Sequence, residues 1–313
     1  MIVTEHTSLR LELVRLGLRW FIKRRAPHPT AEAARRTFRA MEILIPRPPR
    51  STRTTAVDAG GVKADCITTP ASRADRHVLY LHGGAYRVGS PSTYRHFTWR
   101  VASVARARVL AIDYRLAPEH PFPAPLEDAL SAYRWMLENG ATPNRLLVMG
   151  DSAGGGLALA LLLKLRDEHL PLPAAAVALS PWTDLASTGA SLKLNARADP
   201  MIKAEYVPKF AAEYLAGANP RNPYASPLYG DPSGLPPTLI QVGDDEVLRD
   251  DSVRMADKMR RANCRVELQI WPRVPHCWHL LAPVLPEARA AIARMSDFIE
   301  RTLPADEQAD PQA

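Results

Sequence analysis

The sequence predicts an α/β fold in which a mostly parallel central sheet carries helices on both faces. Short apolar runs of the buried-strand type alternate with helical stretches over most of the chain. Such alternation is typical of a parallel sheet covered on both sides. The chain has 313 residues, 46% of them hydrophobic, which is enough to bury one large core. We therefore expect one α/β domain with helical additions.

Eight strands are expected, and the first two flank Gly60-Gly61, a hairpin signal. The expected strands are residues 54–59, 64–69, 78–81, 109–112, 146–149, 174–179, 238–242 and 266–270. Clear helical patterns cover residues 126–137 and 153–165.

The first 50 residues form an expected N-terminal helical cap segment, and residues 51–313 form the α/β domain. Leu9, Leu13, Leu16 and Trp20 fall on one helical face, so we expect this face to pack over the rest of the protein. A helix lying on a membrane surface is the alternative. The proline-rich residues 46–49 end the segment.

Residues 182–235 interrupt the alternation, because they contain many prolines and no convincing strand. We expect a helical insertion between two strands of the sheet. Together with the N-terminal helices, this insertion could form a lid.

The chain carries a net charge of +7, but no nucleic-acid-reading motif accompanies its arginines, so we expect no nucleic-acid partner. Cys66, Cys264 and Cys277 have neither metal-ligand spacing nor the pattern of a disulfide framework, which favours a reducing compartment. No signal-peptide pattern is found, and the longest apolar run, residues 156–163, is too short to span a bilayer. We expect a cytoplasmic protein without stable membrane insertion.

A candidate nucleophile lies where the expected strand 146–149 meets the helix that follows it. Gly150-Asp151-Ser152-Ala153-Gly154 matches the pattern G-x-S-x-G, in which a strained strand-to-helix turn exposes a serine. The small residues from 153 to 156 allow the tight turn that this geometry needs. The alternatives are an ordinary glycine-rich turn and a phosphate-binding turn, but no Lys or Thr follows in P-loop fashion. Ser152 is thus the candidate for nucleophilic catalysis.

A glycine loop upstream is suited to stabilise an oxyanion. His82-Gly83-Gly84-Ala85-Tyr86 follows the expected strand 78–81 and is similar to the HGGG-type motif of lipases and esterases. Glycine lets the backbone approach a substrate closely. We expect the N–H groups of Gly83, Gly84 and Ala153 to form the oxyanion hole. His82 precedes Ser152, out of order for a catalytic base in this pattern, and is expected to hold the loop.

The base is expected after the last strand, in the loop before the final helix. His276 and His279 both lie there, and His276 is favoured because it is nearer the strand end. The acid is expected after the strand 238–242. The neighbouring Asp244, Asp245 and Glu246 compete, and spacing alone does not separate Asp245 from Glu246. Asp250 and Asp251 fit better as residues that open a helix.

Five segments in order resemble the bacterial hormone-sensitive-lipase-like esterases. They are HGGAY at 82–86, DYRLAPEHPFPA at 113–124, GDSAGG at 150–155, GDDEVLRDD at 243–251 and PHCW at 275–278. Together they extend over most of the α/β domain. The resemblance implies the α/β-hydrolase fold with a helical cap, and it implies that Ser152, Glu246 and His276 form a catalytic triad.

Two positions depart from the family pattern. Members commonly read Asp-Pro-Leu-Arg-Asp at the acid, and alignment on Leu248-Arg249-Asp250 places Glu246 in the slot of the aspartate, with Asp245 as the second choice. Ala85 stands where many members have a third glycine. Because alanine leaves the backbone amides free, we expect little effect.

The resulting functional hypothesis is a serine carboxylesterase that cleaves short-to-medium acyl esters through an acyl-enzyme. The expected partner is a small-molecule ester, and no cofactor or metal is required. The family resemblance also makes a homodimer possible, paired through the last strand. The alternatives are hydrolysis of a lactone, an amide or an acetylated metabolite by the same triad, and a non-catalytic small-ligand receptor on this fold.

Overall fold

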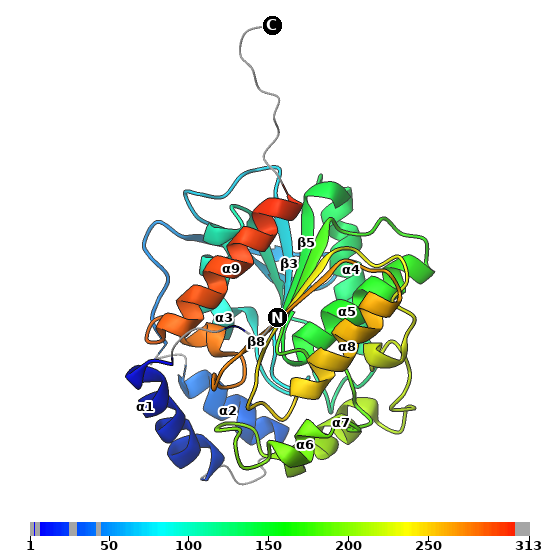
Figure 1. Cartoon of the computed structure of the whole chain (residues 1–313). Helices are drawn as coiled ribbons and strands as arrows, with labels where there is room; N and C mark the ends of the chain where they lie inside the picture. The colour runs from blue at the N-terminus through cyan, green and yellow to red at the C-terminus, as the bar shows by residue number, and fades with distance from the viewer. Residues whose placement is uncertain (1–2, 4–6, 25–29, 42–44, 304–313) are drawn as a thin grey trace, which may run out of the picture.

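The sheet of the computed structural model has eight strands in the order β1-β2-β4-β3-β5-β6-β7-β8 (Figure 1). The structure describes residue 3 and residues 7–24, 30–41 and 45–303. β2 pairs antiparallel with both β1 and β4, and the remaining neighbours are parallel. The prediction of a mostly parallel sheet in an α/β fold is confirmed.

The elements follow one another as the alternation predicts. The strands are β1 Arg53–Asp58, β2 Lys63–Thr68, β3 His77–Leu81, β4 Arg108–Ile112, β5 Leu146–Asp151, β6 Ala175–Leu179, β7 Thr238–Gly243 and β8 Val266–Trp271. The α-helices are α1 Leu9–Gly17, α2 Ala31–Met41, α3 Pro91–Val104, α4 Ala124–Glu138, α5 Ala153–Asp167, α6 Ser191–Leu194, α7 Val207–Leu215, α8 Arg249–Arg261 and α9 Pro286–Thr302. A π-helix, η1 Leu18–Lys23, extends α1, and short 3₁₀ turns are η3 Pro143–Arg145, η4 Ala204–Tyr206, η5 Pro227–Tyr229 and η6 Trp278–Leu281.

Helices cover both faces of the sheet. α3 and α9 share one apolar cluster with the sheet, and α4, α5 and α8 share the other. Residues 153–163 of α5 are all Ala, Gly or Leu and are buried on every side, so this helix packs directly on the central strands. α1, α2, α6 and α7 gather at one end of the molecule (Figure 1). The helices on both faces hold the sheet in place. The loops that follow β5 and β7 leave it at the carboxyl ends of the strands, where ligand sites of open α/β sheets lie.

The N-terminal helix packs through a different face from the one expected. Leu9, Leu13 and Leu16 are 85%, 69% and 60% exposed, whereas Leu11 and Arg15 are buried. The prediction that the leucine face packs on the protein is therefore wrong. Hydrophobic periodicity marks a face that prefers to leave water, but the face that turns inward here carries Leu11 and the ion-paired Arg15.

The insertion between β6 and β7 holds helices and turns but no strand among its residues 182–235, all of which are described. α6, η4, α7 and η5 make up its regular structure. That this insertion and residues 1–50 form the cap, with these boundaries, stays a prediction.

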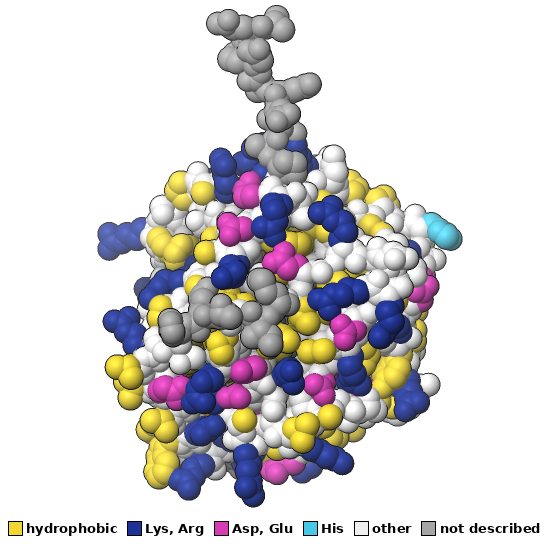
Figure 2. Space-filling view, viewed as in Figure 1, with side chains coloured by type: hydrophobic (Ala, Val, Ile, Leu, Met, Phe, Trp, Pro, Cys, Tyr) yellow, Lys and Arg dark blue, Asp and Glu magenta, His cyan; other side chains and the backbone are white. Residues whose placement is uncertain are grey.

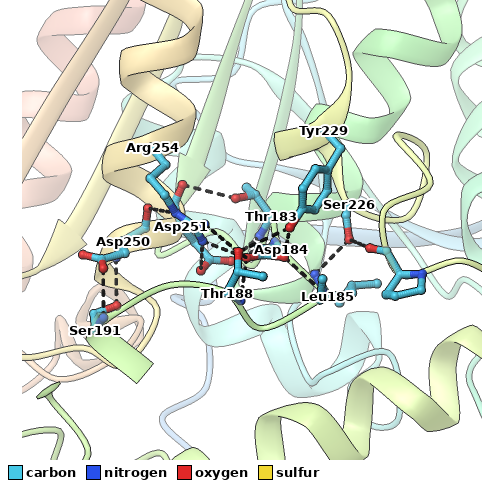
Figure 3. Close-up of polar contacts among 12 residues, drawn as sticks. Thr183, Asp184, Leu185, Thr188, Ser191, Ser226, Tyr229, Asp250, Asp251 and Arg254 are labelled. Carbon is cyan, nitrogen blue, oxygen red and sulfur yellow. Dashed lines mark hydrogen bonds and ion pairs between the residues drawn. The ribbon is translucent and has the colours of Figure 1, made fainter. Parts of the chain in front are cut away.

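Two buried carboxylates fasten the start of the insertion to α8 (Figure 3). Asp251, in the first turn of α8, accepts hydrogen bonds from the backbone N–H groups of Thr183 at 2.8 Å and Asp184 at 2.9 Å. Asp184 in turn accepts from the Arg254 guanidinium at 2.8 Å and from the Tyr229 hydroxyl at 3.0 Å. Burial, and next the charge of Asp184, raise the pKa of Asp251 to about 7. The chain beyond β6 is thus anchored beside the loop that follows β7.

β8 forms one edge of the sheet, and β1 forms the other edge. Pairing of two copies through this edge stays a prediction. None of the described helices combines the length and the apolar character needed to cross a membrane.

Candidate active site

Ser152 occupies a strained turn between β5 and α5. Its backbone has φ 53° and ψ −122°, a conformation that L-residues rarely adopt. The turn requires glycine on both sides of the serine. A Cβ on Gly154 would lie 2.1 Å from the Leu81 carbonyl oxygen, and one on Gly150 would lie 2.2 Å from the Gly154 oxygen. The local sequence therefore presents the Ser152 hydroxyl at the carboxyl end of the sheet, as the motif predicts.

The structure brings Ser152, His276 and Glu246 together in one hydrogen-bonded line. The Ser152 hydroxyl lies 2.8 Å from Nε2 of His276, and Nδ1 of the same ring lies 2.6 Å from Oε2 of Glu246. Because a carboxylate only accepts, Nδ1–H donates to Glu246 and Nε2 is left to accept from the serine. These three side chains come from positions 124 and 30 residues apart in sequence.

The charge of Glu246 makes His276 a stronger base. Burial by itself lowers the pKa of His276, but the negative charge of Glu246 and the hydrogen bond to it outweigh burial. The pKa of His276 is consequently raised above its ordinary value. An imidazole with this pKa is suited to take a proton from a hydroxyl group and to return it.

Glu246 is fully buried, and its second oxygen is held by two donors. Oε1 accepts a hydrogen bond from the Ser180 hydroxyl at 2.7 Å and another from the Gly243 backbone N–H at 2.7 Å. The Ser180 hydroxyl also accepts from the backbone N–H of Cys277, at 3.3 Å. Ser180 therefore links the loop of the acid to the loop of the base. Sequence reasoning missed Ser180, and nothing in its local pattern distinguishes it from a residue that merely ends a strand.

The two competing candidates lie elsewhere. Asp245 points to the N-terminal helix, where it pairs with Arg15 at 2.5 Å. His279 is buried, lies against the Trp278 ring and makes a 2.9 Å hydrogen bond with Gln241. Burial lowers the pKa of His279 to about 3, so its ring stays neutral. The geometry thus favours Glu246 over Asp245 and His276 over His279.

The glycine loop presents different amides from those expected. The N–H of Gly83 donates to Oδ1 of Asp151 at 3.0 Å, so it is not directed at a substrate. Within the described part of the chain, the N–H groups of Gly84 and Ala85 have no hydrogen-bond partner. The expectation of Gly83 as an oxyanion donor therefore conflicts with its geometry. That of Gly84 does not, and neither does that of Ala153, which opens α5 with a free amide.

Asp151 holds this loop from beneath. Its buried carboxylate accepts from the Tyr80 hydroxyl at 2.6 Å and the Tyr94 hydroxyl at 3.1 Å in addition to Gly83. His82 binds the Gly83 carbonyl oxygen through Nδ1 at 2.7 Å and stacks on the Tyr114 ring, which is the holding role expected for it. The motif contains Asp151, but only the fold shows that this residue connects the strained turn at Ser152, the nucleophile elbow, to the glycine loop.

A mostly apolar cavity of about 340 Å³ opens beside these groups. Ser152, His276, Gly84 and Ala85 line it, and the remaining wall is formed largely by apolar side chains. The N-terminal segment contributes Ile22, Ala34 and Phe38, and the insertion contributes Trp182, Met201, Ile202, Tyr206, Val207 and Phe210. A small organic molecule with an apolar portion fits such a cavity.

Cys277 also lines the cavity, next to His276. Burial raises the pKa of the Cys277 thiol well above its ordinary value, so the sulfur stays protonated. Ser152 is accordingly the better nucleophile of the two.

Comparison with known proteins agrees with the geometry. A family profile described as an alpha/beta hydrolase fold matches residues 78–280. An acetyl-hydrolase of Streptomyces hygroscopicus is 44% identical over 294 residues, which cover 93% of this chain and 96% of that protein. An esterase of Acinetobacter venetianus is 35% identical over 239 residues, covering 76% and 78% of the two chains.

Solved structures extend the agreement to three dimensions. The crystal structure of an esterase from the bacterial hormone-sensitive lipase family is 43% identical, with a TM-score of 0.90, and the match covers 96% of this chain and all of that one. An esterase/lipase from an uncultured bacterium is 40% identical over 95% of this chain, also with a TM-score of 0.90. The fold is thus shared with esterases over nearly the whole chain. The chain is a carboxylic ester hydrolase and belongs to the bacterial hormone-sensitive-lipase-like family of the α/β-hydrolase fold.

Proposed function

We propose that this esterase cleaves short-to-medium acyl esters through an acyl-enzyme on Ser152. His276 Nε2 takes the hydroxyl proton while Ser152 Oγ bonds to the acyl carbon. Collapse of the tetrahedral intermediate breaks the bond to the alcohol oxygen, which receives the proton from His276. Water then attacks the acyl-enzyme in the same way and releases the acid. The observation that carries this proposal is the Ser152–His276–Glu246 line of 2.8 Å and 2.6 Å, with its serine end in the cavity.

The oxyanion hole in this mechanism consists of the N–H groups of Gly84, Ala85 and Ala153. Gly84 and Ala85 line the cavity beside Ser152, and Ala153 directly follows it. Gly84 has φ 115°, and a Cβ there would lie 2.1 Å from the Val88 carbonyl oxygen, so the loop conformation demands glycine. Ala85 takes over the donor role that the sequence assigned to Gly83. Each preorganised donor is worth about 3 kcal/mol of transition-state stabilisation.

Covalent labelling of Ser152 provides a direct test. An alkyl p-nitrophenyl phosphonate should attach to Ser152 and to no other serine, because among the described residues only this serine hydroxyl is hydrogen-bonded to a histidine beside the cavity. Peptide mass spectrometry locates the adduct, and residual ester hydrolysis should fall in proportion to labelling. Labelling of another residue, or full activity after complete labelling of Ser152, would contradict the proposal.

A series of p-nitrophenyl esters tests the acyl preference. The cavity of about 340 Å³ holds a short or medium acyl chain with its alcohol, so kcat/KM should peak between acetyl and octanoyl and fall at palmitoyl. A palmitoyl ester cleaved faster than the butyryl ester would overturn the preference. Chain-length profiles are to be taken below the micelle concentration of each ester.

Removal of an acetyl group from a metabolite is the second candidate, favoured by the name of the Streptomyces acetyl-hydrolase. In the same series, a sharp maximum at acetyl with little butyryl hydrolysis would select it. The catalytic residues are identical in the two cases, so only the breadth of acyl acceptance separates them.

A further inference from the structure

A row of large hydrophobic side chains is exposed on the outer face of the N-terminal helix. Leu9, Leu13, Leu16 and Trp20 are 85%, 69%, 60% and 52% exposed, and their spacing places them on one face of α1 and η1. Figure 2 shows hydrophobic side chains at the lower left of the molecule, where Figure 1 places α1. We call these four residues the exposed stripe. Contiguous apolar surface of this kind marks an interaction site on most proteins.

The polar border of the exposed stripe is cationic. Arg10, Arg19 and Arg24 are exposed, and the Arg24 guanidinium lies 4.7 Å from the centre of the Trp20 ring. Glu12, which is the only acidic residue of the segment Leu9–Lys23, is paired with Arg273 at 2.8 Å. Leucines and a tryptophan on one face with arginines beside them are typical of a helix that lies in a lipid–water interface.

The helical segment that carries the stripe also contributes to the wall of the active-site cavity. η1 continues α1, and its residue Ile22, two positions after Trp20, lines the cavity. Phe38 of α2 lines the same cavity and is itself 37% exposed. A bilayer that covers the stripe would therefore lie against a segment whose other side forms part of the cavity wall.

The helix is held rigidly enough to present this face in one orientation. Arg15, 3% exposed, binds Asp245 and the carbonyl oxygen of Arg273, and the backbone N–H of Ser8 donates to Glu287 at 2.6 Å. Substitutions on the outer face leave all of these contacts in place.

We propose that the exposed stripe docks this enzyme on the surface of an anionic phospholipid bilayer. Each leucine or tryptophan inserted among the headgroups removes apolar area from water, and the flanking arginines gain from the negative surface. A second copy of the chain is a poorer occupant, because a two-fold contact through this face would bring together two surfaces that are both bordered by arginines.

Vesicle flotation tests the proposal with the full chain. Wild type should float with phosphatidylcholine vesicles that contain phosphatidylglycerol, less with pure phosphatidylcholine, and less again at high salt. The variant Leu9→Gln/Leu13→Gln/Leu16→Gln should lose about tenfold or more in partitioning, because glutamine keeps helix propensity but not apolar surface. Leu194→Gln, which alters a leucine 79% exposed on α6, is the matched control and should float as wild type does.

Two measurements on each variant establish that the fold is intact: hydrolysis of p-nitrophenyl butyrate and the thermal midpoint. If the triple variant unfolds, the single variant Leu13→Gln replaces it in the flotation experiment. The proposal fails if wild type does not float, or if the stripe variants float as well as wild type. It also fails if wild type is a dimer by light scattering and the stripe variants are monomers that float unchanged, since the stripe would then be an interface between copies.

Discussion

Ser152→Ala is expected to lower turnover of p-nitrophenyl butyrate by about 10⁶-fold, the order found when the nucleophile of a serine hydrolase is removed. Alanine removes the attacking oxygen but leaves the backbone of the elbow and the amides of the oxyanion hole in place. The remaining rate should exceed that in water, because those amides still stabilise the charge of an attacking water molecule. Initial rates at saturating ester, with enzyme at high concentration, measure the loss.

Ser233→Ala is the matched control, since Ser233 is an exposed serine in a loop of the insertion. It should retain wild-type turnover. Both variants should melt at the wild-type temperature, because the Ser152 hydroxyl contributes only a hydrogen bond to a partly solvated site. Turnover of Ser152→Ala within tenfold of wild type would remove Ser152 from the mechanism.

Glu246→Gln is expected to lower turnover about 10⁴-fold, as the equivalent change does in other triads. Ser180 and Gly243 both donate to Oε1, so the amide oxygen of glutamine has to stay on their side. The amide NH₂ group then faces Nδ1 of His276 and forces the proton onto Nε2. In that tautomer the ring can no longer accept the proton of Ser152.

The pH profile gives an independent readout of the same variant. Protonated His276 cannot act as a base, so wild-type kcat/KM should fall as the pH drops through the raised pKa of His276, above the ordinary histidine value. Glu246→Gln removes the negative charge that raises this pKa. The acidic limb of its residual activity should therefore move to lower pH. A limb that stays in place would show that Glu246 does not act through His276.

Asp245→Asn is the matched control, because it removes the same charge one residue away. It breaks the ion pair with Arg15 but leaves the line from Glu246 to Ser152 intact. We expect it to lower thermal stability while turnover stays within about tenfold of wild type. A larger loss of turnover in Asp245→Asn than in Glu246→Gln would assign the role of the triad acid to Asp245.

The sheet could be predicted well because buried strands carry their own signal. Runs such as residues 146–149 are continuously apolar, and β5 and β6 are buried throughout. The nucleophile elbow could be predicted from local sequence as well, since the strand, the glycines and the helix all lie within 20 residues of Ser152. Neither required knowledge of a distant contact.

The acid and the oxyanion hole could not be derived from local residues in the same way. Asp245 and Glu246 have the same chemistry at adjacent positions, and what separates them is that Arg15, 230 residues earlier, pairs with one of them. The family resemblance supplied the preference for Glu246 that spacing could not. Gly83 failed as a donor for a similar reason, because the backbone turns at Gly84 and Asp151 captures its amide.

The contact between Arg15 and the two loops that follow β7 and β8 also orders events during synthesis. Arg15 leaves the ribosome long before Asp245 and Arg273, which lie 230 and 258 positions later in the chain. Until they emerge, α1 lacks the ionic partners of its inward side, while its leucines still face outward. The inward side of α1 can therefore complete its packing only after most of the chain has been synthesised.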